Sequence, residues 1–170
     1  MLATSEIAAV LTVAVTGVGS AVVDMWTRRV PNPLTLGTAA FGVLLAASHH
    51  TNLSVYQALA GFGLGLLLML PSYIFGATGG GDVKLVAAYG TLLGPRTIVF
   101  AFLYMAIAGG LIAILVALAR RNLRATVGRA AVLVGSRGGN VAEIEHVATN
   151  NRFAYAPAIA LGALIAALGW

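Results

Sequence analysis

Six uncharged apolar stretches follow one another along this chain, and they constrain its fold more than any other feature. They cover residues 7–23, 34–48, 53–75, 85–94, 97–119 and 153–170. A helix needs about 17–25 apolar residues to cross a bilayer, which most of these stretches supply. Charged residues make up only 9% of the chain, too few to cover a water-soluble domain. We therefore predict an all-α fold, a polytopic membrane helical bundle of about six segments forming one domain, residues 1–170.

The fourth stretch, residues 85–94, is too short to span a membrane. Its ten residues would rise only about 15 Å as a helix. Such a half-helix is tolerated in hydrocarbon only against other protein or a wet cavity. Residues 76–82, just before it, are rich in glycine, which destabilises a helix by about 1 kcal/mol per residue relative to alanine. We therefore predict a short fourth helix after an unwound glycine-rich stretch, where interrupted helices often form functional sites.

The basic residues indicate how the chain is oriented. If the N-terminus lies outside, nine of the ten Lys and Arg residues fall in the inner gaps at residues 24–33, 76–84 and 120–152. Cytoplasmic loops carry this excess of positive charge. We therefore predict a multi-pass protein of the cytoplasmic (inner) membrane, in contact with the lipid bilayer and binding no nucleic acid. Within the last gap, we expect a cytoplasmic amphipathic helix over 120–134, followed by a flexible loop.

The predicted topology places Asp24 and Asp82, the two aspartates of the chain, at cytoplasmic ends of segments and at one depth. Carboxylates near hydrocarbon are unfavourable and are commonly functional. Two carboxyls held close together retain one proton between them, so one can act as a base and the other as an acid. From spacing alone, two other interpretations stay open. Each aspartate could cap a helix near basic neighbours, or both could serve ion transport.

Local sequence motifs favour the acid–base interpretation. Residues 79–85 read Gly-Gly-Gly-Asp-Val-Lys-Leu, a Gly-x-Gly-Asp pattern followed by x-Lys-Leu. Asp24 precedes an Arg-Arg-Val-Pro-Asn sequence at 28–32, and residues 155–162 read Tyr-Ala-Pro-Ala-Ile-Ala-Leu-Gly. In this order, the motifs resemble those of the type IV prepilin peptidases, in particular the short form associated with Flp (tight-adherence) pili.

The resemblance implies an intramembrane aspartyl endopeptidase that removes the basic leader peptide from prepilin-like precursors at the cytoplasmic face. It implies that Asp24 and Asp82 are the catalytic pair and that no cofactor takes part. Longer members carry paired cysteines in an insertion that accompanies N-methylation. This chain has no cysteine, so we expect neither methyltransferase activity nor a metal site. Two alternative functions are a small ion-coupled membrane carrier and a non-enzymatic pilus or secretion assembly subunit.

Five further residues are candidates for supporting roles. We expect Gly79 and Gly81 to let the backbone unwind so that the second aspartate can approach the first. Lys84 could offset charge near the pair, or it could simply be a positive-inside anchor. Glu143 and Glu145, in the inner loop, could attract a basic leader and increase its rate of association.

Overall fold

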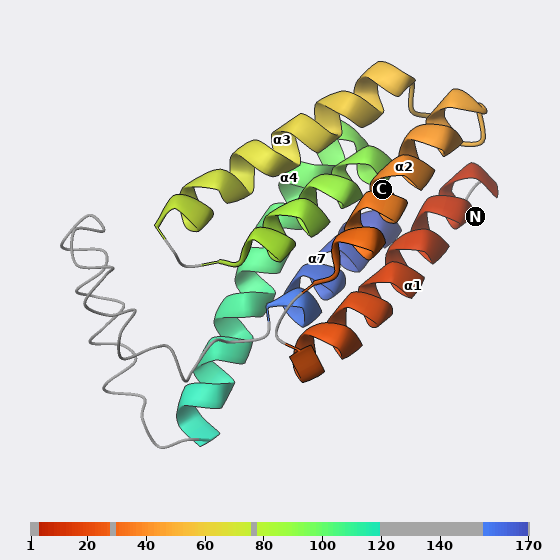
Figure 1. Ribbon diagram of the computed structural model, residues 1–170. Coiled ribbons are helices and arrows are strands. Elements are labelled where there is room, and N and C mark those ends of the chain that lie inside the picture. The colour runs from red at the N-terminus through yellow and green to blue at the C-terminus, as the bar shows by residue number, and fades with distance from the viewer. Residues whose placement is uncertain (1–3, 28–29, 76–77, 120–154, 170) are drawn as a thin grey trace.

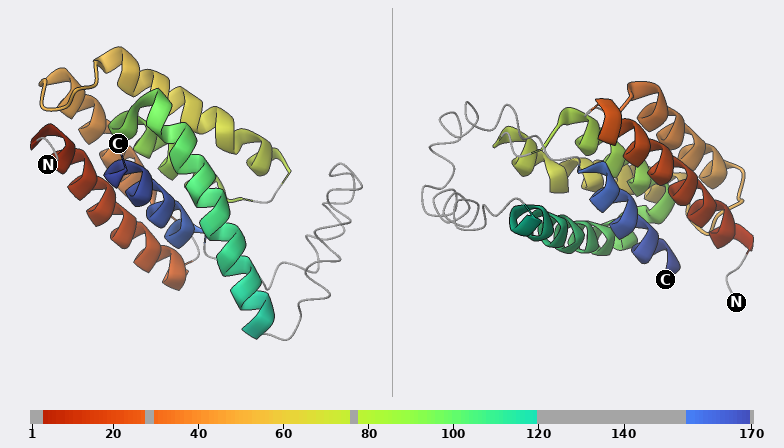
Figure 2. Two further views of the ribbon diagram at one scale, coloured as in Figure 1. Left: turned by 180° about the vertical axis from the view of Figure 1, so that it is seen from behind. Right: turned by 90° about the horizontal axis from the view of Figure 1, so that it is seen from below.

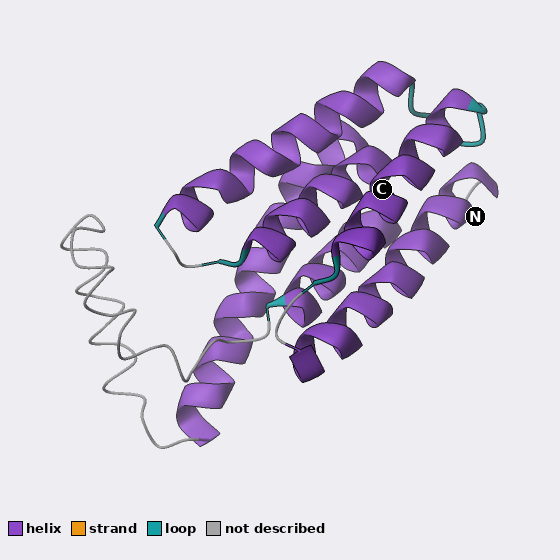
Figure 3. Ribbon diagram, in the orientation of Figure 1, coloured by secondary structure: helices purple, strands orange, loops and turns teal. Residues whose placement is uncertain are grey.

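The structure is a computed structural model, and it describes residues 4–27, 30–75, 78–119 and 155–169. Within those ranges, all regular secondary structure is helical (Figure 3), which confirms the predicted all-α class. Figure 1 labels the helices: α1 (Thr4–Thr27), α2 (Asn32–Ala47), α3 (Val55–Ile74), α4 (Gly80–Ala119) and α7 (Ala156–Leu168).

Helix starts in the described ranges follow from local sequence. Ser54 caps α3 with a capping box. Its hydroxyl accepts a hydrogen bond from the Gln57 backbone, and the Gln57 side chain accepts one from the Ser54 backbone. These bonds satisfy donors that have no partner within the helix. Both α2 and α7 carry a proline near the start, where the missing N–H does not break the hydrogen-bond ladder.

The helix α4 consists of two helices joined at a break. Gly94 has φ 75° and ψ 175°, and Pro95 follows it. This backbone conformation is essentially restricted to glycine, and the chain reverses its direction there (Figure 1 and Figure 2). The first part, residues 80–93, rises only about 21 Å. The fourth helix is therefore short, as predicted.

The first part of α4 forms the centre of the bundle. Leu85, Val86 and Tyr89 are fully buried, and α4 packs against α2, α3 and α7. On α3, Gly61 and Gly65 lie directly against the backbone of α4, at Gly90 and Val86. Small residues allow membrane helices to approach this closely. The short helix is therefore enclosed by protein, which is the condition under which hydrocarbon tolerates it.

Three helical spans in the described ranges are long and apolar enough to cross a membrane: Ile7–Thr27, Val55–Ile74 and Gly80–Leu115. The last of these contains the reversal at Gly94. The apolar helices α2 and α7 are shorter. Large hydrophobic side chains such as Leu11 and Val15 point outward from the bundle, as expected where the solvent is lipid. The structure supports a membrane protein, and the number of segments that cross the bilayer stays a prediction.

Two predicted boundaries were wrong. Residues 80–82, expected to be unwound, form the first turn of α4, and Asp82 and Val83 donate backbone hydrogen bonds to the Gly79 carbonyl. The first N–H groups of a helix need no intrahelical partner, so a helix can begin among glycines. The helix α1 continues to Thr27, past its predicted end. The amphipathic helix and loop predicted within 120–152, including Glu143 and Glu145, lie outside the described residues.

Candidate active site

Asp24 lies in the last turn of α1, on the buried face that also carries Gly17 and Ser20. Its side chain is 5% exposed. The carboxylate Oδ2 accepts a hydrogen bond of 3.1 Å from the backbone N–H of Ala156, the first residue of α7. That N–H is not used within α7, and the N-terminus of a helix favours a negative charge. The start of α7 therefore holds this carboxylate in place.

Asp82 lies in the first turn of α4 and is partly buried. Its Oδ2 accepts a hydrogen bond of 3.2 Å from the backbone N–H of Gly79. The carboxyl groups of Asp82 and Asp24 are near enough to interact electrostatically. The structure thus brings together the two aspartates singled out from the sequence, one at the end of α1 and the other at the start of α4.

Gly79 and Gly81 have different roles at the start of α4. Gly79 precedes the helix and donates to Asp82, and a Cβ atom there would lie 3.4 Å from Asp82 Oδ2. Gly81 is helical, so its predicted unwinding was wrong. A Cβ atom at Gly81 would lie 3.1 Å from the Cβ atom of Val30 and 3.2 Å from its backbone nitrogen. Gly81 therefore allows the chain that follows α1 to pack closely on the start of α4.

Lys84 is exposed, and its Nζ donates a hydrogen bond of 3.0 Å to Oδ1 of Asn32, which is 52 residues away in sequence. Asn32 is the first residue of α2. The lysine therefore links the start of α4 to the start of α2. The sequence motif contains Asn32, but an asparagine at a helix start ordinarily bonds to nearby backbone, so the motif does not indicate a partner 52 residues away.

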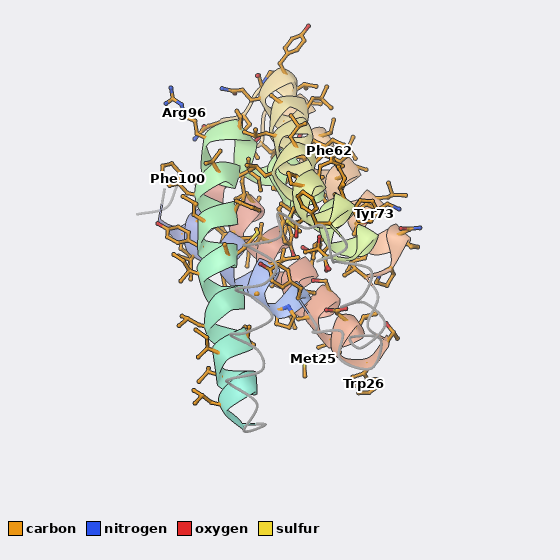
Figure 4. The ribbon with its side chains drawn as sticks, turned by 90° about the vertical axis from the view of Figure 1, so that its left-hand side faces the viewer. Met25, Trp26, Phe62, Tyr73, Arg96 and Phe100 are labelled. Carbon is orange, nitrogen blue, oxygen red and sulfur yellow. The ribbon has the colours of Figure 1, made fainter. Side chains whose placement is uncertain are left out.

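Aromatic and apolar side chains surround this end of the bundle. Met25, Trp26 and Tyr73 are 66%, 86% and 50% exposed. In Figure 4 these side chains project outward from the ends of α1 and α3, and Arg96 lies apart from them. Trp and Tyr are enriched where a membrane meets water. Their positions are those expected if the aspartates lie near the membrane surface.

Metal binding requires several ligand side chains to lie close together. Nowhere in the described ranges do three or more His, Cys, Asp or Glu side chains gather closely enough to hold a metal ion. Asp24 and Asp82 are two carboxyl groups close enough to interact. One can accept a proton from water while the other donates one to a carbonyl oxygen.

Comparison with known proteins identifies one family. The model of the type IV leader peptidase family matches residues 8–114, more than half of the chain. The match includes both aspartates and ends before α7. Comparison with curated proteins and comparison with solved structures each gave no match.

Proposed function

The chain belongs to the type IV leader peptidase family, and from this premise we propose that it is an aspartyl endopeptidase that uses Asp24 and Asp82. The observation that carries the proposal is the meeting of these two carboxyl groups at one end of the bundle, within electrostatic range. The backbone N–H of Ala156, 132 residues away in sequence, holds Asp24, and the neighbouring backbone N–H of Gly79 holds Asp82. Two carboxylates that only capped their own helices would have no need to lie within electrostatic range of each other.

The proposed reaction is peptide-bond hydrolysis by water, without a covalent intermediate or a cofactor. One carboxylate removes a proton from water as the water oxygen bonds to the scissile carbonyl carbon. The other carboxyl, which retains its proton because two adjacent charges repel, donates that proton to the carbonyl oxygen. The tetrahedral intermediate then collapses, the C–N bond breaks, and the leaving nitrogen receives a proton from the pair.

We propose that the substrate is a prepilin-like precursor that has a basic leader and an apolar first helix. The aromatic side chains of Trp26 and Tyr73 support a site near the membrane surface, where such a precursor emerges from the bilayer. Residues 85–95 of α4 separate Lys84, beside the site, from Arg96, near the reversal. Together with the basic residues of the sequence, this favours an N-terminus outside and a site at the cytoplasmic face of the inner membrane.

The absence of cysteine from the sequence favours cleavage without the N-methylation that longer relatives perform. The short form associated with Flp pili is the type that these features fit. The assignment of pilus type, the cleavage of the leader and the lack of methylation all belong to this proposal.

Co-expression with a prepilin-like precursor tests the proposed function. We expect Asp24→Asn and Asp82→Asn each to reduce cleavage by at least about 100-fold, because acid or base catalysis commonly contributes that much. The readout is precursor mobility in isolated membranes. Glu6→Gln is the matched control, since it changes a carboxylate to an amide in α1, far along the sequence from the pair, and we expect it to cleave normally. Substantial cleavage by either aspartate variant would exclude the proposed pair.

A further inference from the structure

The start of α7 lies beside the candidate site. The backbone of Ala156 donates to Asp24. The preceding residue, Tyr155, is partly buried, and its side chain is near enough to Asp82 for the two to interact electrostatically. Two consecutive residues therefore interact with the two carboxyl groups. Ala156 does so through its backbone N–H, and Tyr155 through the electrostatic effect of its side chain.

The ring of Tyr155 rests on a glycine in the second part of α4. A Cβ atom added at Gly109 would lie 2.6 Å from Cε2 of Tyr155 and 2.9 Å from its hydroxyl oxygen. Any other residue at position 109 would therefore displace the ring. The next residue, Gly110, has no atom within 4 Å of such a Cβ position. Of this pair of adjacent glycines, only Gly109 provides a surface for the tyrosine.

We propose that Tyr155 is a positioning residue whose ring, resting on Gly109, keeps the start of α7 in place and with it the carboxylate of Asp24, which Ala156 holds. The inference rests on the proposed peptidase function and adds a device that sets the relative placement of the two carboxyl groups. Because Ala156 is bonded to Asp24, a movement of Tyr155 changes the position of Asp24 relative to Asp82. A displacement of about 1 Å between reacting groups can reduce a rate by about 100-fold.

Kinetics with purified full-length protein in lipid vesicles and a synthetic precursor test this inference. We expect Tyr155→Ala and Gly109→Ala each to lower kcat by about 100-fold and to leave KM nearly unchanged, because alignment changes while the substrate surface does not. Tyr155→Phe keeps the ring and should keep kcat near that of wild type. The matched control, Gly110→Ala, should behave as wild type. Adding Gly109→Ala to Tyr155→Ala should cause no further loss, because the ring is already absent.

Three results would overturn the inference. These are a normal kcat for Gly109→Ala, independent and additive losses in the double variant, or a loss in Tyr155→Phe as large as in Tyr155→Ala. If Gly109→Ala does not fold, as judged by thermal unfolding, the comparison of Phe with Ala at position 155 decides the outcome. Failure of the proposed function is distinguishable, because wild type itself would then produce no cleaved product.

Discussion

Gly61 and Gly63 lie two residues apart in α3, but only one of them contacts another helix closely. A Cβ atom at Gly61 would overlap the carbonyl oxygen of Gly90 and would lie 2.9 Å from its carbonyl carbon. A Cβ atom at Gly63 would have no atom within 4 Å. We predict that Gly61→Ala destabilises the bundle relative to Gly63→Ala.

The size of the difference follows from packing distances. Carbon atoms pack best at about 3.5–4.0 Å, so α3 and α4 would have to separate by roughly 0.5–1 Å near Gly61 to relieve the contact with the carbonyl carbon alone. A gap of that size forfeits a quarter to a half of the dispersion energy of each separated contact. Overpacking a close-packed site typically costs about 1–3 kcal/mol. Both variants gain about 1 kcal/mol of helix propensity, which cancels, so their unfolding free energies should differ by about 1–3 kcal/mol.

The assay is reversible unfolding in mixed detergent micelles, with the two variants measured side by side against wild type. The first part of α4 carries both Gly90 and Asp82, so Gly61→Ala should also slow precursor cleavage more than Gly63→Ala does. Equal unfolding free energies for the two alanine variants would refute the close approach of α3 and α4 at Gly61.

Two other predictions concern the surroundings of the site. Asn32→Ala removes the acceptor of the hydrogen bond from the Lys84 ammonium and should lower the unfolding free energy by about 0.5–1.5 kcal/mol. A double-mutant cycle with Lys84→Met should show that the two losses are not additive. Additive losses would contradict a direct bond. Replacing Glu143 and Glu145 together by Gln should slow processing of a basic leader more at low salt than at high salt, because salt screens long-range attraction. Equal slowing at both salt concentrations would argue against steering by these residues.

The sequence by itself determined the class of fold and pointed to the candidate pair. Long uncharged runs form helices in hydrocarbon because each backbone N–H and C=O must be bonded within its own segment. The sequence also predicted the break between the fourth and fifth stretches, where Gly94 and Pro95 disfavour a continuous helix. Asp24 and Asp82 stood out because carboxylates are rare in so apolar a chain. All of these are local properties, which residue type and spacing express directly.

The tertiary structure decided how the pair is held. The Ala156 N–H bonds to a carboxylate 132 residues earlier in the chain, and Lys84 bonds to a side chain 52 residues earlier. Hydropathy does not encode such partners, because it reports which segments enter the membrane and not which helix ends meet. The start of α4 at Gly80 and the placement of Tyr155 on Gly109 likewise depend on neighbouring helices. Close packing selects these contacts, and it exists only once the helices have assembled.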